Sequence, residues 1–177
     1  KSVNGFVFDR PDAVAAAVLK KDEMSRLVDS VESTFAAVAQ ANPAFKDRTA
    51  VLLGGRVAGD AVTATVGGWR TDFLTAMGFA VPESIKASPA SGGQAMITRD
   101  DLAAAVDSAD VLIWCTESDA EQSALLADPT VAGLRATAMK RNVFTPAGLA
   151  GAIAYASPLS YPLVADRLPA LLAQALG

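Results

Sequence analysis

The chain has 177 residues with a hydrophobic fraction of 51%, which is enough for one sizeable core, and it has no apolar run as long as the roughly 18 residues of a bilayer span. A formal net charge of −4, with lysines and arginines scattered singly or in pairs, argues against nucleic-acid binding. Histidine is absent and there is one cysteine, which removes the commonest general base, the commonest metal ligand and every Ser/His or Cys/His nucleophile arrangement.

Two helices are expected before the first strand. Asp9 can cap and Pro11 can open a short helix over 13–20. From Asp22 onward, apolar residues recur at three- and four-residue spacing, which predicts a longer amphipathic helix that ends at Asn42-Pro43. These helices have no strand of their own, and the chain starts without a Met or a signal segment. We therefore expect a fragment or a processed product, in which the helices originally packed against a part that is missing.

Strands and helices alternate through the rest of the chain. Apolar runs predict buried strands at 49–53, 111–115 and 142–144, with a second, weaker strand or a loop at 61–66. Helices are expected over 69–77, 98–106 and 119–127, after Pro129, and from Ser157 onward, while 82–93 is rich in turn residues. The alternation predicts a three-layer α/β/α lobe with a mostly parallel sheet, preceded by a long linker helix.

Ligands of open α/β sheets bind outside the carboxyl ends of the strands, where the loops converge. This rule selects the segments 54–70, 116–117 and 145–157. The stretch 54–59 is rich in glycine, but it fits neither the dinucleotide fingerprint nor the Walker pattern, so we expect a flexible turn there. No pair of acids forms a catalytic constellation, because adjacent ones such as Asp100-Asp101 point to different sides of a helix.

Aromatic and cationic side chains in these segments are candidates for ligand contact. Trp69 beside Arg70 offers a flat ring and a fixed cation, although Trp69 could equally cap a helix and Arg70 be a surface charge. Core packing competes with ligand contact for Trp114, on a strand, and for Tyr155, in a loop of small residues. We expect Cys115 to be a small buried apolar residue. The candidate set is Arg56, Trp69, Arg70, Trp114, Glu117 and Tyr155.

Several segments carry a resemblance to a known family, in the family's order. They are the helix end at 35–45, the strand entry at 46–53, the stretch 70–79, which is similar to Arg-x-x-Phe-Leu-x-x-x-Gly-Phe, the pair 97–102 and 107–114, and the closing segments 149–152 and 157–160. Together they resemble the class III, or helical-backbone, periplasmic binding proteins of iron-siderophore ABC importers.

The resemblance implies two α/β lobes joined by a long helix, with the ligand clamped between them. Residues 1–45 would then contain the inter-lobe helix and 46–177 would form the C-terminal ligand-binding lobe, with the N-terminal lobe missing. It further implies a periplasmic or lipid-anchored protein on the outer face of the cytoplasmic membrane, which delivers its ligand to a membrane permease. We expect a permease contact at Glu83, on the cleft-side rim, although an ordinary solvated glutamate is the competing interpretation.

The function expected from the resemblance is binding of a ferric siderophore, without enzymatic activity and without a cofactor. Arg70 and Arg56 would meet the ligand's charge, and its apolar surface would meet the aromatic candidates. The siderophore, and not the protein, would chelate the iron. Haem or a corrinoid is the alternative ligand of the same fold. A small nucleotide-binding α/β enzyme, resting on 54–59 alone, is the alternative of another class.

Overall fold

The computed structural model describes residues 21–177, and the short helix expected over 13–20 lies outside that range. The first described helix, α2 (Lys21–Ala41), has acidic residues in its first turn, where they suit the helix dipole. Its apolar face carries Val31 and Phe35, which are buried, and α2 packs on α10 and α3. The helix ends where the Asn42 side chain donates to the Val38 carbonyl, and the short 3-10 helix Pro43–Phe45 follows. The long helix predicted from the sequence is therefore present.

The sheet has six strands, β1 (Ala50–Ala58), β2 (Ala61–Thr65), β3 (Ala90–Ser91), β4 (Gln94–Thr98), β5 (Val111–Cys115) and β6 (Asn142–Phe144), in the order β3-β4-β2-β1-β5-β6. Parallel pairing joins β1 to β5 and β5 to β6, whereas β1–β2, β2–β4 and β3–β4 are antiparallel. As a result β1, β4, β5 and β6 run in one direction, and β2 and β3 run against it. The expected predominance of one strand direction is confirmed, and the antiparallel strands lie on one side of β1.

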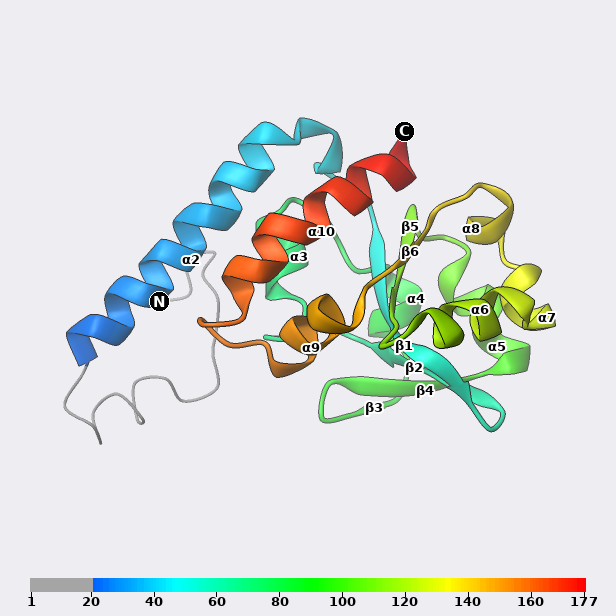
Figure 1. The fold of residues 1–177 in the computed structure, drawn as a ribbon. Coiled ribbons are helices and arrows are strands. Elements are labelled where there is room, and N and C mark those ends of the chain that lie inside the picture. Colours follow the sequence, from blue (N-terminus) through cyan, green and yellow to red (C-terminus); the bar gives the residue numbers. More distant parts are fainter. Residues whose placement is uncertain (1–20) are drawn as a thin grey trace.

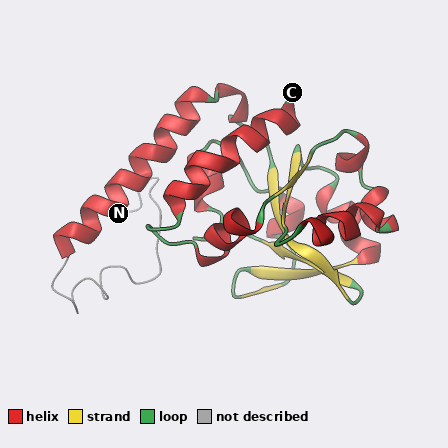
Figure 2. Ribbon diagram, in the orientation of Figure 1, coloured by secondary structure: helices red, strands yellow, loops and turns green. Residues whose placement is uncertain are grey.

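Helices cover both faces of this sheet (Figures 1 and 2). Successive residues of the central strands pack on opposite faces of the sheet. Leu52 and Ile113 lie in one core cluster, and Val51 and Leu112 lie in the other. The first cluster includes residues of α2, α3 (Asp72–Ala76), α9 (Ala147–Tyr155) and α10 (Tyr161–Leu176). The second includes residues of α4 (Glu83–Lys86), α5 (Arg99–Val106), α6 (Asp119–Ala127), α7 (Pro129–Ala132) and α8 (Arg135–Ala138). The three-layer architecture predicted from the sequence is confirmed.

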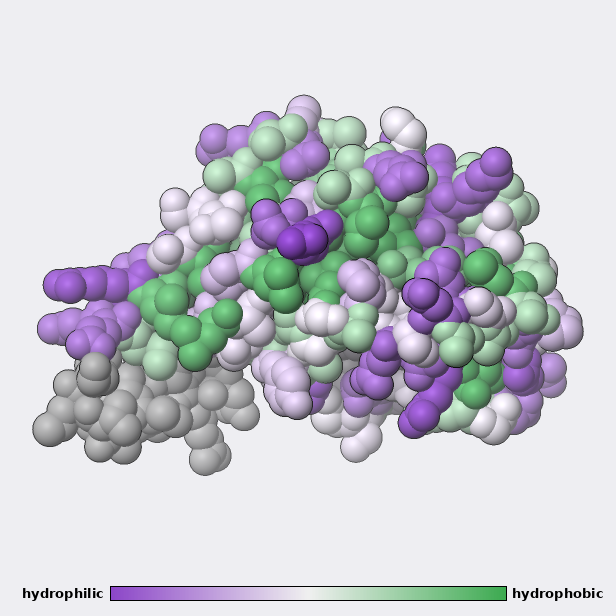
Figure 3. All heavy atoms as spheres, viewed as in Figure 1, coloured by the Kyte–Doolittle hydropathy of each residue, from purple (hydrophilic) through white to green (hydrophobic). Residues whose placement is uncertain are grey.

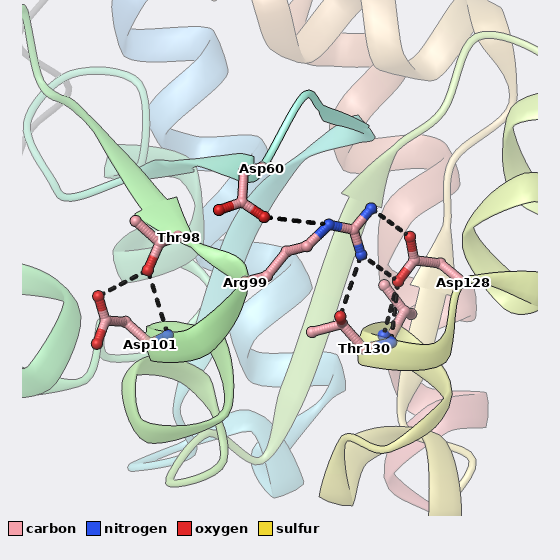
Figure 4. Close-up of polar contacts among 7 residues, drawn as sticks. Asp60, Thr98, Arg99, Asp101, Asp128 and Thr130 are labelled. Carbon is pink, nitrogen blue, oxygen red and sulfur yellow. Dashed lines mark hydrogen bonds and ion pairs between the residues drawn. The ribbon is translucent and has the colours of Figure 1, made fainter.

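An ion-pair network holds the first turn of α5, which follows β4, and the first turn of α7, which follows α6 (Figure 4). Arg99 binds Asp128 through both terminal nitrogens, each at 2.8 Å, and its Nε lies 3.6 Å from Asp60 in the β1–β2 turn. Thr98 caps α5 by accepting from the Asp101 amide. The hydrogen bond from Arg99, aided by the amides that Asp128 caps, lowers the pKa of the Asp128 carboxyl despite partial burial. The network ties three segments distant in sequence to one edge of the sheet.

A second carboxylate anchors the opposite edge, where β1 and β5 begin. Asp110 accepts from the Thr49 amide at 2.9 Å and the Thr49 hydroxyl at 3.0 Å, and it pairs with Arg48 at 3.1 Å. Burial is the largest single influence on the Asp110 pKa and raises it, but the Thr49 and Arg48 contacts together outweigh burial, so the pKa is lowered. The two central parallel strands are thus held in register at their amino ends.

Apolar surface is visible along α2 and α10 in Figure 3, between charged groups. On α2 the residues Met24, Leu27, Val28 and Val38 are half-buried, and Val28 and Val38 pack against the first core cluster. Within residues 21–177, no helix is both long and apolar enough to cross a membrane.

Candidate functional site

At Gly55, strand β1 passes very close to the carboxyl end of β5. A Cβ atom on Gly55 would lie 2.2 Å from the Cys115 carbonyl oxygen, so only glycine fits at this position. The β1–β2 register shifts between Leu53 and Val57, which is the mark of a bulge. The expected flexible turn at 54–59 is therefore wrong: β1 continues to Ala58, and Arg56 lies on the strand instead of in a loop.

Two adjoining hollows open beside this close approach. One encloses about 110 Å³, and its lining includes Gly54, Arg70 and Cys115. The other encloses about 140 Å³ and is lined by Gly55, Arg56, Cys115, Glu117 and Glu121. Because Cys115 lines both hollows and Gly54 adjoins Gly55, we treat them as one feature, the carboxyl-edge crevice. Arg56 and Arg70, both predicted from the segment 54–70, and Glu117, predicted from 116–117, line this crevice.

Arg70 is the most distinctive side chain of the crevice. Its guanidinium carbon lies 4.5 Å from the centroid of the Trp69 ring, within the range of a cation–π contact. Its Nη1 donates to the Ala154 carbonyl at 3.4 Å, a long hydrogen bond near the end of α9. Its Nε is buried and has no hydrogen-bond partner among residues 21–177. An unpaired buried donor costs free energy, so Arg70 retains capacity for an acceptor supplied from outside the chain.

The turn that carries this pair precedes α3. Trp69 and Arg70 therefore lie outside the helix that was expected to start at 69. Gly67 and Gly68 have φ values of +146° and +83°, which a residue with a side chain rarely adopts. The Thr71 amide closes the turn onto the Gly68 carbonyl at 2.9 Å. A reversal built on two glycines brings the Trp69 ring and the Arg70 cation side by side.

The acidic end of the crevice lies at the start of α6. Glu121 accepts from the Glu117 amide at 2.7 Å, and Ser118 caps the helix by accepting from the Glu121 amide. The side chains of Glu117 and Arg56 are exposed. The crevice therefore offers cations at both ends and carboxylates at one.

The remaining aromatic candidates differ in exposure. Tyr155 is 82% exposed and ends α9, so its expected loop is a helix, closed by Ala156 in the left-handed region. It follows Ala154, the acceptor of Arg70, and so lies beside the crevice. Trp114 is 0% exposed, packs in the second core cluster and donates from Nε1 to Asn142 at 3.0 Å. Direct ligand contact by Trp114 is therefore wrong, because the core encloses its ring.

Cys115 lies on the wall common to both hollows, yet its thiol is inert. Burial raises the pKa of this thiol to about 12, so it stays protonated at neutral pH. Among residues 21–177, no group of three or more His, Cys, Asp or Glu side chains could hold a metal ion.

Glu83 lies elsewhere. It begins α4 and pairs with Lys86 at 2.7 Å, and its side chain is 86% exposed. The next residue, Ser84, donates to the Ala105 carbonyl near the end of α5. Because α5 runs back from the carboxyl end of β4 toward the amino end of β5, this contact lies toward the edge opposite the crevice. Glu83 is exposed, as expected, but it does not line the crevice, and a permease contact at this residue stays a prediction.

Sequence reasoning missed other lining residues of the crevice, because it did not anticipate β4 or α9. The antiparallel neighbours β2 and β4 contribute Thr63, Thr65 and Gln94, and α9 contributes Ile153 and Ala154. Exposed and buried residues alternate over 94–98 in the structure, but the apolar Met96 is exposed, so the sequence lacks the polar–apolar alternation that would have revealed β4. A larger hollow of about 340 Å³ lies between β6, α6 and α10, but none of the predicted site residues lines it.

Comparison with known proteins places this geometry in context. Residues 5–148 match the family described as periplasmic binding protein. A periplasmic solute binding protein from Mycobacterium smegmatis is 50% identical, with a TM-score of 0.83; the match covers 93% of this chain and 55% of that one. No match was found among curated proteins.

Two more distant structures share the fold. PiaA of Streptococcus pneumoniae in complex with ferrichrome is 20% identical, with a TM-score of 0.73, and the match covers 92% of this chain and 55% of that one. FhuD2 of Staphylococcus aureus with bound ferrioxamine B is 16% identical, with a TM-score of 0.74, and the match covers 94% of this chain and 64% of that one. The present chain thus spans little more than half the length of the solved proteins that it resembles.

Proposed function

Because the chain belongs to the periplasmic binding protein family, we propose that it is the C-terminal ligand-binding lobe of an ABC importer's substrate-binding protein, and that its ligand is a ferric siderophore. Residues 1–45 include the helix that leads to a second lobe, and 46–177 form the lobe described above. This division accords with a match that covers 55% of the Mycobacterium smegmatis protein. The role is binding and delivery to a membrane permease, outside the cytoplasmic membrane, and not catalysis.

The observation that carries the proposal is the state of Arg70. Its guanidinium is held against Trp69 at the crevice and keeps a buried Nε without a partner in the described part of the chain. A ferric siderophore surrounds its metal with oxygen atoms that carry negative charge, and a guanidinium donates to such acceptors through a rigid fork. The Trp69 ring and the exposed Tyr155 ring suit the apolar parts of the same ligand. Arg56 adds a second cation, and iron needs no ligand from the protein.

The alternatives have less support. For haem or a corrinoid in the same fold, this chain has no histidine to supply an axial ligand. The nucleotide-binding enzyme rested on a phosphate loop at 54–59, and that segment is a strand. A closely paired strand does not present a row of free amides to a phosphate.

The experiment is a calorimetric titration of the full-length protein that contains this chain. Ferrichrome, ferrioxamine B, haemin and cobalamin are titrated separately, with metal-free ferrioxamine B as the control for the iron-dependent shape of the ligand. Saturable binding of at least one ferric siderophore, with no binding of haemin or cobalamin, is the expected result. Tight binding of haemin or cobalamin alone would replace the siderophore with that ligand.

A further inference from the structure

Tyr161 joins three elements at a single buried point. It opens α10 and is 0% exposed. Its ring meets the edge of Phe35 from α2, with centroids 5.8 Å apart and planes at 88°, and it lies 5.9 Å from the ring of Phe73 on α3. Such edge and tilted contacts between aromatic rings are favourable. The position of the Tyr161 ring is therefore fixed by two other helices.

The hydroxyl of this ring reaches the turn that carries Arg70. Tyr161 Oη donates to the Trp69 carbonyl oxygen at 3.0 Å. Burial raises the pKa of the phenol, and the nearby Asp72 acts in the same direction, so the hydroxyl remains a donor at all physiological pH values. The acceptor belongs to the residue whose ring supports the guanidinium of Arg70.

The turn needs an anchor of this kind. Gly67 and Gly68 have no side chains, and their positive φ values are accessible to few other residues. The Thr71 amide and hydroxyl both bond the Gly68 carbonyl, which closes the turn on itself without tying it to another element. The bond from Tyr161 instead comes from 92 residues away and connects the turn to α10.

We propose that Tyr161 is a positioning residue of the ligand site: its hydroxyl holds the Trp69–Arg70 turn against the α2–α3–α10 helices, so that the Arg70 guanidinium stays aimed at the crevice. The role in ligand binding rests on the function proposed above. Tyr161 does not touch the ligand, because its ring is enclosed by the core. It acts through the orientation of Arg70, and through Phe35 it connects that orientation to α2.

The test uses Tyr161→Phe in the full-length protein, because this change removes the hydroxyl and keeps the ring. Hydrogen exchange, measured by mass spectrometry on the peptide spanning 66–76, reports how firmly the turn is held without any ligand. Calorimetry reports the affinity for ferrioxamine B or ferrichrome, whichever binds the wild type, in the presence and absence of Arg70→Ala. Thr137→Val is the matched control, since Thr137 also donates to a backbone carbonyl, that of Val131, but on the far side of the sheet.

Faster exchange in 66–76 and an affinity about fivefold lower are expected for Tyr161→Phe, from the loss of one neutral hydrogen bond. In the Arg70→Ala background, the same change should leave the affinity unaltered. Thr137→Val should change neither quantity. Unchanged exchange, or an affinity loss that persists without Arg70, would overturn the positioning role. If the wild type binds no ferric siderophore, the function proposed above fails, while the exchange measurement still decides whether Tyr161 holds the turn.

Discussion

The guanidinium of Arg70 lies 4.5 Å above the ring of Trp69, its neighbour in sequence, and this stacking is possible because two glycines reverse the chain just before it. Adjacent residues in a helix or a strand point in different directions and cannot stack in this way. The turn therefore converts a dipeptide into a preorganised aromatic and cationic surface. Preorganisation lowers the entropy lost on binding, which is the general advantage of such a site.

The close approach of β1 and β5 predicts an unequal tolerance of two glycines to alanine. Gly55→Ala should destabilise the fold by about 1–3 kcal/mol or more, as overpacking does, because the new methyl group would meet the Cys115 backbone at 2.2 Å. Gly148→Ala, in α9 where nothing lies within 4 Å of the new atom, should be neutral or should stabilise the protein by up to about 1 kcal/mol. Urea unfolding measures both. Equal effects of the two substitutions would contradict the geometry at the strand ends.

The single cysteine gives a direct probe of the crevice. Because burial raises the pKa of the Cys115 thiol to about 12, alkylation by iodoacetamide at pH 8 should be far slower than for a free thiol, and it should accelerate as the pH rises toward 12. A ligand bound in the crevice should slow it further. The rate is followed by mass spectrometry, with the unfolded protein in urea as the reference. Rapid labelling of the folded protein at pH 8 would show that the crevice is more open than described.

The lowered pKa of Asp110 predicts part of the loss of folding stability at acid pH. Its pKa lies below the ordinary value of 3.8 in the folded protein, so its contribution to stability is complete above about pH 4 and disappears as the pH falls through the folded-state pKa. Asp110→Asn should lower the free energy of unfolding at pH 7 by about 1.5–3 kcal/mol, the range for hydrogen bonds to a charged group. The difference from wild type should shrink below pH 3.8.

The control for this measurement is Asp166→Asn, whose carboxylate is 69% exposed and pairs only with the adjacent Arg167 among the interactions described. Exposed pairs contribute little to stability, so this variant should match the wild type throughout. A constant difference between Asp110→Asn and wild type from pH 7 to pH 2 would show that the charge of Asp110 is not what stabilises the strand starts.

Substitution of Tyr155 can distinguish an effect on ligand binding from an effect on folding. Because its side chain is 82% exposed, Tyr155→Ala should leave the free energy of unfolding within about 0.5 kcal/mol of wild type. The same substitution should weaken siderophore binding, because Tyr155 follows Ala154, which lines the crevice, and its ring contacts the ligand in the proposed complex. Leu159→Ala, at an equally exposed position of 81%, is the control and should alter neither quantity. Unaltered siderophore affinity in Tyr155→Ala would remove this residue from the site.

Much of the fold follows from patterns that the sequence displays openly. The apolar runs at β5 and β6 are strong signals because these strands are covered on both faces. The helical spacing of α2 is a strong signal because one face of this helix packs on the core. Elements with weak patterns were missed. The helix α9 is built mainly of small residues, with glycines at 148 and 151, and shows almost no amphipathic spacing.

The candidate site was predictable only in part. The rule that ligands bind at the carboxyl ends of strands brought Arg56, Arg70 and Glu117 to one edge, as the structure has them. It could not reveal that Trp114 points into the core, because the direction of a strand residue depends on register. Nor could it reveal the bond from Tyr161 to Trp69, which joins residues 92 positions apart without a local signal.

The most direct test of the account is the siderophore affinity of Arg70→Ala compared with that of Arg167→Ala, both in the full-length protein. Arg167 is an exposed arginine on α10, paired with its neighbour Asp166, and it lines neither hollow of the crevice. We predict that Arg70→Ala weakens binding of the ferric siderophore by about 1.5–3 kcal/mol, the cost of losing a hydrogen bond to a charged group. Arg167→Ala should bind as the wild type does. Equal affinities for all three proteins would contradict the placement of the ligand at the Trp69–Arg70 turn.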